Sequence, residues 1–485
     1  MVNLFLLPTV GLGLPLFSLA LAALLYWLIR AVFTLYLSPL RHIPGPWYAA
    51  VSDIYFLSCV VRLRQSKIIH GLFETYGPIV RIGPNRVAFN DVAGLKSVYS
   101  VGRFDKGPFY RTGSWVFSIL EHAPHSARRK IVAPHYTPDN MRSFEPEIQA
   151  IVGTMLSTLE TIDKPVDCLA MFHHLMMDVI LVTAYDCHLD AVQLALSLLL
   201  NDFVRVGVLR NTLPSWFWAP ISMFPNARWR QFCAASEIVQ DYVSDRVEEL
   251  RAKMDSGLMK DRKPMVQRLL ESGLPSLDVT AEAIGHTVAG TDTTATTLSY
   301  MCYTLSQRPD VVQRLRSELE SFADGSSVDM SVLTLPYLNA FLKEGLRLYG
   351  SAPSLLERVV PGVKTNSEPF SLLEYDLPAG TLVGAQSWSL SRDPSVFISP
   401  EEFMPERWLS EDTSAMAAHL FPYGFGTRAC VGQTLAQLML RLTLLRKRTA
   451  GAWTYGTCLQ TKTKFQTDNI SGFHVLQDLF PAGFE

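Results

Sequence analysis

A glycine-rich stretch near the C-terminus delivers one cysteine to the start of an apolar helix. It reads Tyr423-Gly424-Phe425-Gly426-Thr427-Arg428-Ala429-Cys430-Val431-Gly432. Apolar residues recur after it at helical spacing, which places Cys430 at or just before a helix N-terminus. The helix dipole lowers a cysteine's pKa there and Arg428 adds a cation, so the position favours the thiolate. The glycines permit tight turns and close approach of a flat ligand.

A thiol in this position has three possible roles: nucleophile, metal ligand, or inert core residue. Free cysteine is among the most buried residue types, so the inert role is the simplest for Cys430 alone. The chain carries no matched His/Asn set at a recognisable spacing, which disfavours a nucleophile.

A second chemical pattern lies in the long apolar segment Thr280 to Gln307. Its centre reads Ala289-Gly290-Thr291-Asp292-Thr293, and six threonines lie between residues 287 and 297. Threonine and glycine are weak helix formers, so such a helix is strained or functional. An acid beside a hydroxyl can relay protons to a site on that face, as an oxygen-handling centre requires, and the structural alternative is a polar kink solvated by ordered water.

A third pattern places Glu344 and Arg347 three residues apart on one helix face, where they can pair. The apolar surroundings argue that this helix is buried, so the pair needs further partners. Arg407, between this helix and the cysteine loop, offers one. We expect a Glu-Arg-Arg cluster that acts as a scaffold clamp.

Composition sets the frame for these motifs. The chain has 485 residues, 48% of them hydrophobic and 18% charged, enough to bury a large core. A net charge of -2 offers no footprint for nucleic acid. Seven scattered cysteines without CxxC pairs indicate neither disulfides nor zinc, and fit a reduced, cytosol-facing environment.

The N-terminus carries a membrane signal. No charged side chain occurs from residue 1 to 29, and Arg30 and Arg41 follow. A span of about 20 apolar residues crosses a bilayer, and the cations after it keep the next domain cytoplasmic. We place the helix between roughly Pro15 and Leu37. A cleaved signal peptide is the alternative, although apolar sequence continues past the Ala20-Leu21-Ala22 site.

The remaining pattern is predominantly helical. A short hairpin is expected between Gly77 and Asn90, and helices over residues 143–162, 168–185, 190–209, 228–254 and 280–307. The fold class is therefore mainly α with a minor β-sheet portion. We divide the chain into an anchor, residues 1–37, a proline-rich elbow, 38–46, and one catalytic domain, 47–485.

Together these motifs resemble the cytochrome P450 family, haem-thiolate monooxygenases of the membrane-bound eukaryotic kind. The resemblance runs from the anchor and elbow to the helix after Cys430, with the motifs in the family's order and spacing. Three positions depart from the usual pattern, namely Tyr423, Ser391 and Met439, and none removes a haem ligand. Residues 449–485 match the family poorly, so its final hairpin is not assigned.

The resemblance implies roles for individual residues. Cys430 is the axial ligand of the haem iron, with Gly426, Arg428 and Gly432 at the family's offsets. Asp292 and Thr293 are the catalytic pair of the oxygen-activation motif, which also includes Ala289 and Gly290. Glu344, Arg347 and Arg407 form the clamp. His125, Arg129 and Arg358, with Arg428, hold the propionates of the haem, expected to be haem b.

The resemblance also implies partners and location. We expect electrons from NADPH-cytochrome P450 reductase, with cytochrome b5 as a further donor, and a single-pass protein of the endoplasmic reticulum membrane facing the cytosol. O2 and a lipophilic small molecule are the expected substrates, in contact with membrane lipid and without nucleic acid. Two other classes stay open: a reductase-independent haem isomerase or dehydratase, and a catalytically dead lipophile-binding protein.

Three segments are expected to enclose the substrate by the same resemblance: Gly102 to Leu120, the face of Ala289 and Thr293, and Ser351 to Leu356. The first is rich in aromatic residues, which implies a lipophilic ligand. A further apolar stretch, Val208 to Phe224, is either a bilayer-dipping entrance or an ordinary buried connection. The overall style resembles fungal biosynthetic members, and a terpenoid is the specific expectation.

Overall fold

The structure is a computed structural model that describes residues 10–111, 115–162, 166–188, 194–212, 216, 218, 220, 223, 226–259, 262–322, 335–362 and 369–444. The chain forms two compact units that alternate along the sequence. The first comprises Met1–Gly94 and Glu357–Ala385, and the second Leu95–Leu356 and Gln386–Glu485. The predicted C-terminal tail, residues 449–485, lies outside the described residues.

The first unit contains the sheet. Strands β1 (Ile79–Gly83) and β2 (Arg86–Phe89) pair antiparallel, with Ile79 opposite Phe89, which confirms the predicted hairpin. β6 (Leu382–Gly384) lies parallel to β2, and β3 (Arg358–Val359) completes the order β1-β2-β6-β3. A separate hairpin joins β4 (Phe370–Leu372) to β5 (Tyr375–Leu377). The helices before the sheet are α2 (Trp47–Val51), α3 (Ile54–Val61) and α4 (Gln65–Tyr76), and α5 (Val92–Lys96) follows β2.

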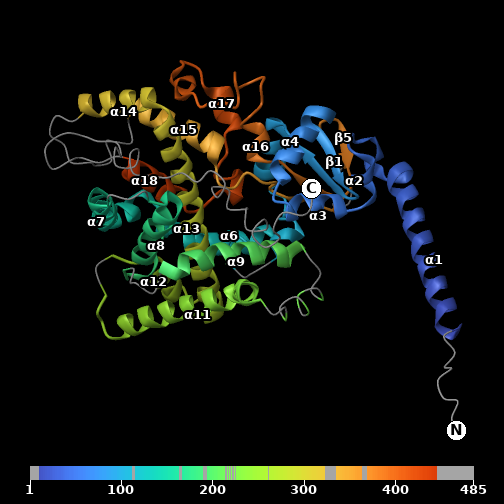
Figure 1. Ribbon diagram of the computed structural model, residues 1–485, viewed down its shortest axis with the longest axis horizontal. Coiled ribbons are helices and arrows are strands. Elements are labelled where there is room, and N and C mark those ends of the chain that lie inside the picture. Colours follow the sequence, from blue (N-terminus) through green and yellow to red (C-terminus); the bar gives the residue numbers. More distant parts are fainter. Residues whose placement is uncertain are drawn as a thin grey trace, which may run out of the picture. The chain divides into compact units, whose positions relative to one another are not determined.

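The N-terminal helix of this unit is exposed and apolar. α1 (Val10–Val32) continues into a π-helical turn, η1 (Phe33–Leu37), so the helix begins before Pro15, upstream of the predicted start. The window Phe17–Leu37 has a mean hydropathy of 1.8 and is only 6% buried, which makes it a candidate membrane span by length and composition. Figure 1 shows α1 as one long helix extending from the short helices that follow it in this unit.

The elbow after α1 is fixed to the sheet. The buried Arg81 of β1 donates to the Thr34 carbonyl at 2.9 Å and to Pro84 O at 2.7 Å, while its backbone N–H donates to Pro44 O at 2.7 Å. Gly45 lies so close that a Cβ there would stand 2.4 Å from Arg81 O. The proline-rich elbow is therefore a rigid joint held by one strand arginine.

The second unit is a helical assembly, which confirms the mainly α fold class. The five predicted helices are present as α7 (Pro138–Thr161), α8 (Cys168–Tyr185), α9 (Leu194–Thr212), α11 (Ala227–Asp255) and α13 (Ser276–Gln307). The others are α6 (His122–Val132), α12 (Met265–Glu271), α14 (Pro309–Phe322), α15 (Pro336–Tyr349), α16 (Ser387–Leu390), α17 (Ser414–His419) and α18 (Gln433–Leu444).

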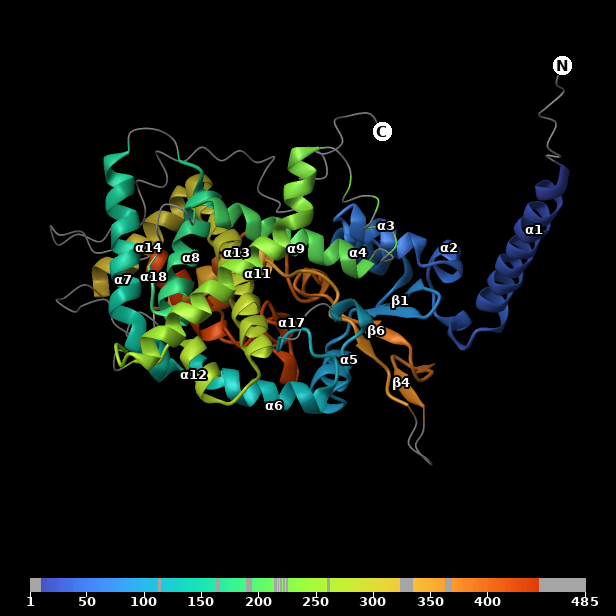
Figure 2. The same ribbon diagram turned by 90° about the horizontal axis from the view of Figure 1, so that it is seen from below.

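Helix α13 runs through the core of this unit beside α8 (Figure 2). α8 also has the length and apolarity of a membrane span, yet 72% of it is buried, as expected of a core helix. Gly290 permits the close approach of the two helices, because a Cβ there would stand 2.4 Å from the Cδ1 of Ile180 on α8. Despite its threonines α13 is continuous from Ser276 to Gln307.

Glu344 of α15 is the centre of a buried ionic cluster. Arg347 donates to both of its oxygens, at 2.9 and 2.8 Å, and Arg407 donates from Nε at 3.1 Å. The indole N–H of Trp408, in the 3-10 turn η9 (Pro405–Leu409), and the Met404 backbone N–H add bonds at 2.8 and 3.0 Å. The structure therefore brings together the three residues of the predicted clamp.

The arginines of the clamp extend its reach into the chain that leads to the cysteine loop. Arg347 Nη1 donates to the carbonyls of Ser391 and Pro400, at 2.9 and 2.6 Å. Arg407 Nη1 donates to Ile398 O at 2.8 Å. Glu344 is fully buried, so two guanidinium groups balance its charge and backbone carbonyls accept their remaining protons.

We predict that Glu344→Gln lowers the free energy of unfolding by about 3–5 kcal/mol, because it leaves two buried guanidinium groups without their counter-charge. Glu406→Gln is the matched control, since Glu406 pairs with Arg314 at 2.9 Å where both side chains are solvent-accessible. That change is expected to cost about 1 kcal/mol or less. Denaturant unfolding of both variants measures the difference, and equal losses would contradict the clamp's role.

Candidate active site

The cysteine loop is shaped by two glycines in the left-handed region. Gly424 has φ +76° and Gly426 φ +69°. A Cβ on Gly426 would stand 2.1 Å from the carbonyl oxygen of Tyr99, so only glycine fits there. The loop closes on itself through the Cys430 N–H, which donates to Tyr423 O at 2.7 Å. At Gly432, by contrast, a Cβ would make ordinary contact at 3.7 Å with the Tyr136 ring.

The prediction that this position lowers the pKa of Cys430 was wrong. The residue reaches the surface, yet protein surrounds most of its thiol, and this burial raises the pKa above its ordinary value. The Gly432 N–H and the charge of Arg129 act in the opposite direction. Helix α18 begins only at Gln433, and the Arg428 guanidinium donates to the Ile119 and Leu120 carbonyls instead of facing the thiol.

A group of basic residues surrounds this loop. His125 on α6 is buried, and its pKa falls to about 3 because of burial and then because of Arg428, Lys106, Arg129 and His122. Arg129 donates to Ala429 O at 2.5 Å, next to the cysteine. The structure thus brings together three of the four predicted propionate partners, namely His125, Arg129 and Arg428. We call these three residues with Lys106 the basic cluster.

Lys106 was missed by the sequence reasoning. It is buried, its Nζ donates to Phe117 O at 2.5 Å, and it lies 3.8 Å from the centroid of the Phe117 ring. The available signal was a single lysine inside an aromatic segment, because burying a charge among apolar rings is costly unless the charge has a partner. Arg358, the fourth predicted partner, belongs to the first unit, where it is buried in β3 and donates to Glu357 O at 2.8 Å.

The middle of α13 presents an open face. Ala289 is exposed although Val288 beside it is buried, and Thr293, one turn further on, is partly exposed. The Thr293 hydroxyl donates to Ala289 O at 2.8 Å, which leaves the lone pairs of its oxygen as acceptors. Asp292 contacts His173 of α8, with 3.0 Å between Oδ1 and Nε2. Gly290 packs against α8, so its assignment as a cofactor contact stays a prediction.

The aromatic segment reaches α13 and the cysteine loop. Trp115 stacks on Phe117, with centroids 5.0 Å apart, and its ring fills the space where a Cβ of Gly285 would stand. Arg428 holds the end of the segment by donating to Ile119 O and Leu120 O at 2.6 and 2.7 Å. Residues 112–114 and part of the apolar stretch 208–224 lie outside the described residues, while Trp216 and Met223 are exposed.

These residues fit the haem that the resemblance implies. A thiol at Cys430 would supply a ligand to the iron, Lys106, Arg129 and Arg428 would supply cations for two carboxylates, and His125 would add a neutral ring N–H as a donor. The Nδ1 atom of His125 is buried without a hydrogen-bond partner among the described residues, as expected of a group awaiting a polar ligand. The Ala289 face is apolar and open. Ring, iron and propionates therefore each have a matching surface.

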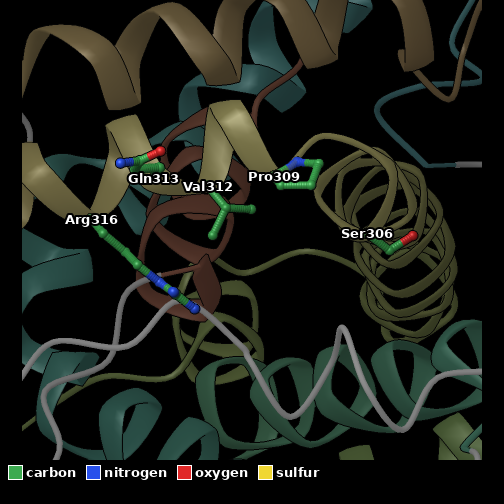
Figure 3. Close-up of a pocket in the computed structure, with 5 residues that line it drawn as sticks. All are labelled: Ser306, Pro309, Val312, Gln313 and Arg316. Carbon is green, nitrogen blue, oxygen red and sulfur yellow. The ribbon is translucent and has the colours of Figure 1, made fainter.

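A surface hollow elsewhere in the second unit has none of these properties. It lies between the end of α13 and α14 (Figure 3), about 20 Å along the helix axis from Thr293. It contains no thiol, carboxylate or imidazole, and its lining consists of Ser306, Pro309, Val312, Gln313 and Arg316. We assign it no part in the chemistry.

We predict that Gly426→Ala abolishes haem retention, because the added Cβ clashes with the Tyr99 carbonyl and a positive φ disfavours alanine. Gly432→Ala is the matched control in the same loop and is expected to keep haem. The ratio of haem to protein absorbance after purification measures both. Normal haem content in Gly426→Ala would contradict the steric argument.

Comparison with known proteins agrees with this geometry. The model of the family described as Cytochrome P450 matches residues 52–446. The chain is 27% identical over 440 residues to the cytochrome P450 monooxygenase stcB of Emericella nidulans, covering 85% of this chain and 82% of that protein. It is 28% identical to the tryprostatin B 6-hydroxylase of Aspergillus fumigatus, covering 84% and 74%. With the cytochrome P450 monooxygenase hkm5 of Aspergillus hancockii the identity is 30%, covering 84% of each chain.

The family model spans most of the chain, and Glu344, Arg347 and Arg407 form the clamp that the family's motifs predict. Family membership brings with it a haem-thiolate cofactor, a redox partner, O2 and a lipophilic substrate. This chain therefore belongs to the cytochrome P450 family and is a haem-thiolate monooxygenase.

Proposed function

We propose that the chain binds haem b through Cys430 and oxidises a lipophilic secondary metabolite, most simply by hydroxylation. When bound, the haem supplies O2 activation, and electron donation from the thiolate favours O–O cleavage. The chain's own contribution is to hold the ring, exclude water and deliver protons. His125, Arg129, Lys106 and Arg428 would hold the propionates, with Arg358 as a further predicted partner.

One observation supports oxygen activation over the other haem chemistries: α13 combines an open apolar face with an acid and a hydroxyl on consecutive residues. Ala289 leaves room beside the helix, while Thr293 has acceptor lone pairs free of its backbone bond. Asp292, whose side chain is 32% exposed, is the group that exchanges protons with solvent. An isomerase or dehydratase has no need for this pair.

The lipophilic substrate follows from the aromatic segment. Phe117 is 48% exposed, although rings of its size are usually buried, and Tyr110 and Trp115 pack around it. The named relatives support the class: one is a hydroxylase of tryprostatin B, and we propose a comparable role in secondary-metabolite biosynthesis. A terpenoid remains our specific expectation.

We further propose that the protein is anchored in the endoplasmic reticulum membrane by residues 1–37, with the elbow 38–46 leading to the cytosolic domain 47–485. The exposure of Phe17–Leu37 supports contact with membrane lipid, and Arg41 follows the span on the proposed cytosolic side. Electrons would then come from NADPH-cytochrome P450 reductase in the same membrane, with cytochrome b5 as a second donor.

Reconstitution tests this function. The full chain, incubated with NADPH, the reductase and a panel of lipophilic metabolites, is expected to give products heavier by one oxygen atom. The reduced protein with carbon monoxide is expected to show the absorbance band of thiolate-ligated haem, and Cys430→Ser to lose it. A haem protein with that band that consumes NADPH without oxygenating any terpenoid or other lipophile would count against the substrate class.

For Thr293 we predict that Thr293→Ala retains haem but diverts electrons to hydrogen peroxide, with product falling by about tenfold or more, because proton delivery is impaired. Ser299→Ala is the matched control, since the Ser299 hydroxyl makes the same bond to a carbonyl four residues back, at 2.8 Å, in a buried part of α13. Product and peroxide per NADPH are measured together. Unchanged coupling in Thr293→Ala would remove the hydroxyl from the mechanism.

A further inference from the structure

A buried histidine on α8 contacts the acid of α13. His173 is 4% exposed, and its Nε2 lies 3.0 Å from Oδ1 of Asp292. The contact joins two helices that pack tightly because Gly290, two residues before Asp292, admits Ile180 of α8. α8 is otherwise largely apolar, with most of its residues in the core. An imidazole that contacts Asp292 from such an apolar helix is expected to act on this carboxylate as well as to fill space in the core.

The other nitrogen of the ring fixes the protonation of this pair. Nδ1 of His173 lies 2.7 Å from the carbonyl oxygen of Leu169, one turn earlier in α8. A carbonyl oxygen only accepts hydrogen bonds, so Nδ1 must carry a proton. The tautomer with a bare Nδ1 would set two lone pairs against each other.

With Nδ1 protonated, the bond between Nε2 and Asp292 requires one further proton. Either Nε2 carries it, as imidazolium beside carboxylate, or Asp292 carries it and donates to a neutral ring. A neutral ring beside a carboxylate would again oppose two lone pairs at 3.0 Å. The hydrogen-bonded pair therefore contains one proton shared between the two side chains.

We propose that His173 is a positioning residue that holds Asp292 in place and stores the proton that Asp292 delivers; the proposal rests on the role proposed above for Asp292 and Thr293. In the delivery step the Nε2–H bond breaks and an O–H bond forms on Asp292. Asp292 then releases a proton toward the open face of α13, and the ring is left neutral. A proton from solvent restores the pair through Asp292, the more exposed partner. No electrons move within the pair.

Two variants separate storage from orientation. His173→Gln places an amide N–H near the position of Nε2, so it can still orient Asp292 but stores no exchangeable proton. His173→Leu removes both functions. His419→Gln is the matched control, because Nδ1 of His419 makes the same contact with a carbonyl four residues back, Ala415 O at 2.8 Å, on α17. All are made in the full-length holoenzyme, and haem content and thermal unfolding report on folding.

The first readout is independent of turnover. Nitrogen-15 NMR of protein labelled at histidine reports the protonation of both ring nitrogens. The chain has 11 histidines, and the signals that disappear in His173→Gln identify those of His173. We expect a protonated Nδ1 and an Nε2 signal that shifts in Asp292→Asn. A His173 ring with a bare Nδ1, or one insensitive to Asp292→Asn, would overturn the shared proton.

The second readout is product and peroxide per NADPH, with the solvent isotope effect. We expect product per NADPH to fall about tenfold in both His173→Gln and His173→Leu, while both variants retain haem. We also expect both to show a larger solvent isotope effect than His419→Gln. Wild-type coupling in His173→Gln would overturn storage by the ring. If Thr293→Ala and Asp292→Asn also leave coupling unchanged, the proposed relay itself has failed. If those two uncouple and the His173 variants do not, only this inference fails.

Discussion

The site depends most directly on the hydrogen bonds and ion pairs made by the buried carboxylate of Glu344. Its two oxygens accept bonds from Arg347, Arg407, Trp408 and the Met404 backbone, so one charge fixes an α15 side chain, a 3-10 turn and the chain between them. Buried ion pairs add little net stability relative to apolar packing, but they demand one arrangement of their donors. The cluster therefore fixes one conformation of the chain that leads to the cysteine loop.

The cysteine loop and α13 meet through shared neighbours. Tyr136 follows α6, would contact a Cβ added at Gly432, and hydrogen bonds to His286 of α13 at 2.7 Å. Trp115 occupies the notch at Gly285 on the same helix. In α13 itself, the hydroxyls of Thr287, Thr291 and Thr293 each donate to the carbonyl four residues back. These bonds satisfy the hydroxyl donors inside the helix and leave the hydroxyl oxygens as acceptors.

The sequence predicted those parts that follow local rules. Helices α7, α8, α9, α11 and α13 and the β1–β2 hairpin follow from apolar spacing and turn residues, because these depend on near neighbours in the chain. The pKa of Cys430 was predicted in the wrong direction because a local dipole rule ignores burial, which outweighs it at this thiol. His173 was missed because it acquires its meaning from a distant partner, Asp292, that spacing along the chain does not reveal. Lys106 lies in the same segment as its partner Phe117, and only the burial of its charge shows that it belongs to the site.

The strand arginine Arg81 has a consequence for exchanging parts between relatives. It bonds to the carbonyl of Thr34, inside the last turn of the apolar helix, and its own backbone bonds to the elbow at Pro44. The end of the helix is thus held by hydrogen bonds to the sheet. A chimaera that takes its anchor from another protein should join it upstream of Phe33, since a junction within the elbow would replace the turn that presents the Thr34 carbonyl to Arg81 and leave the guanidinium only its acceptors Gly83 O and Pro84 O.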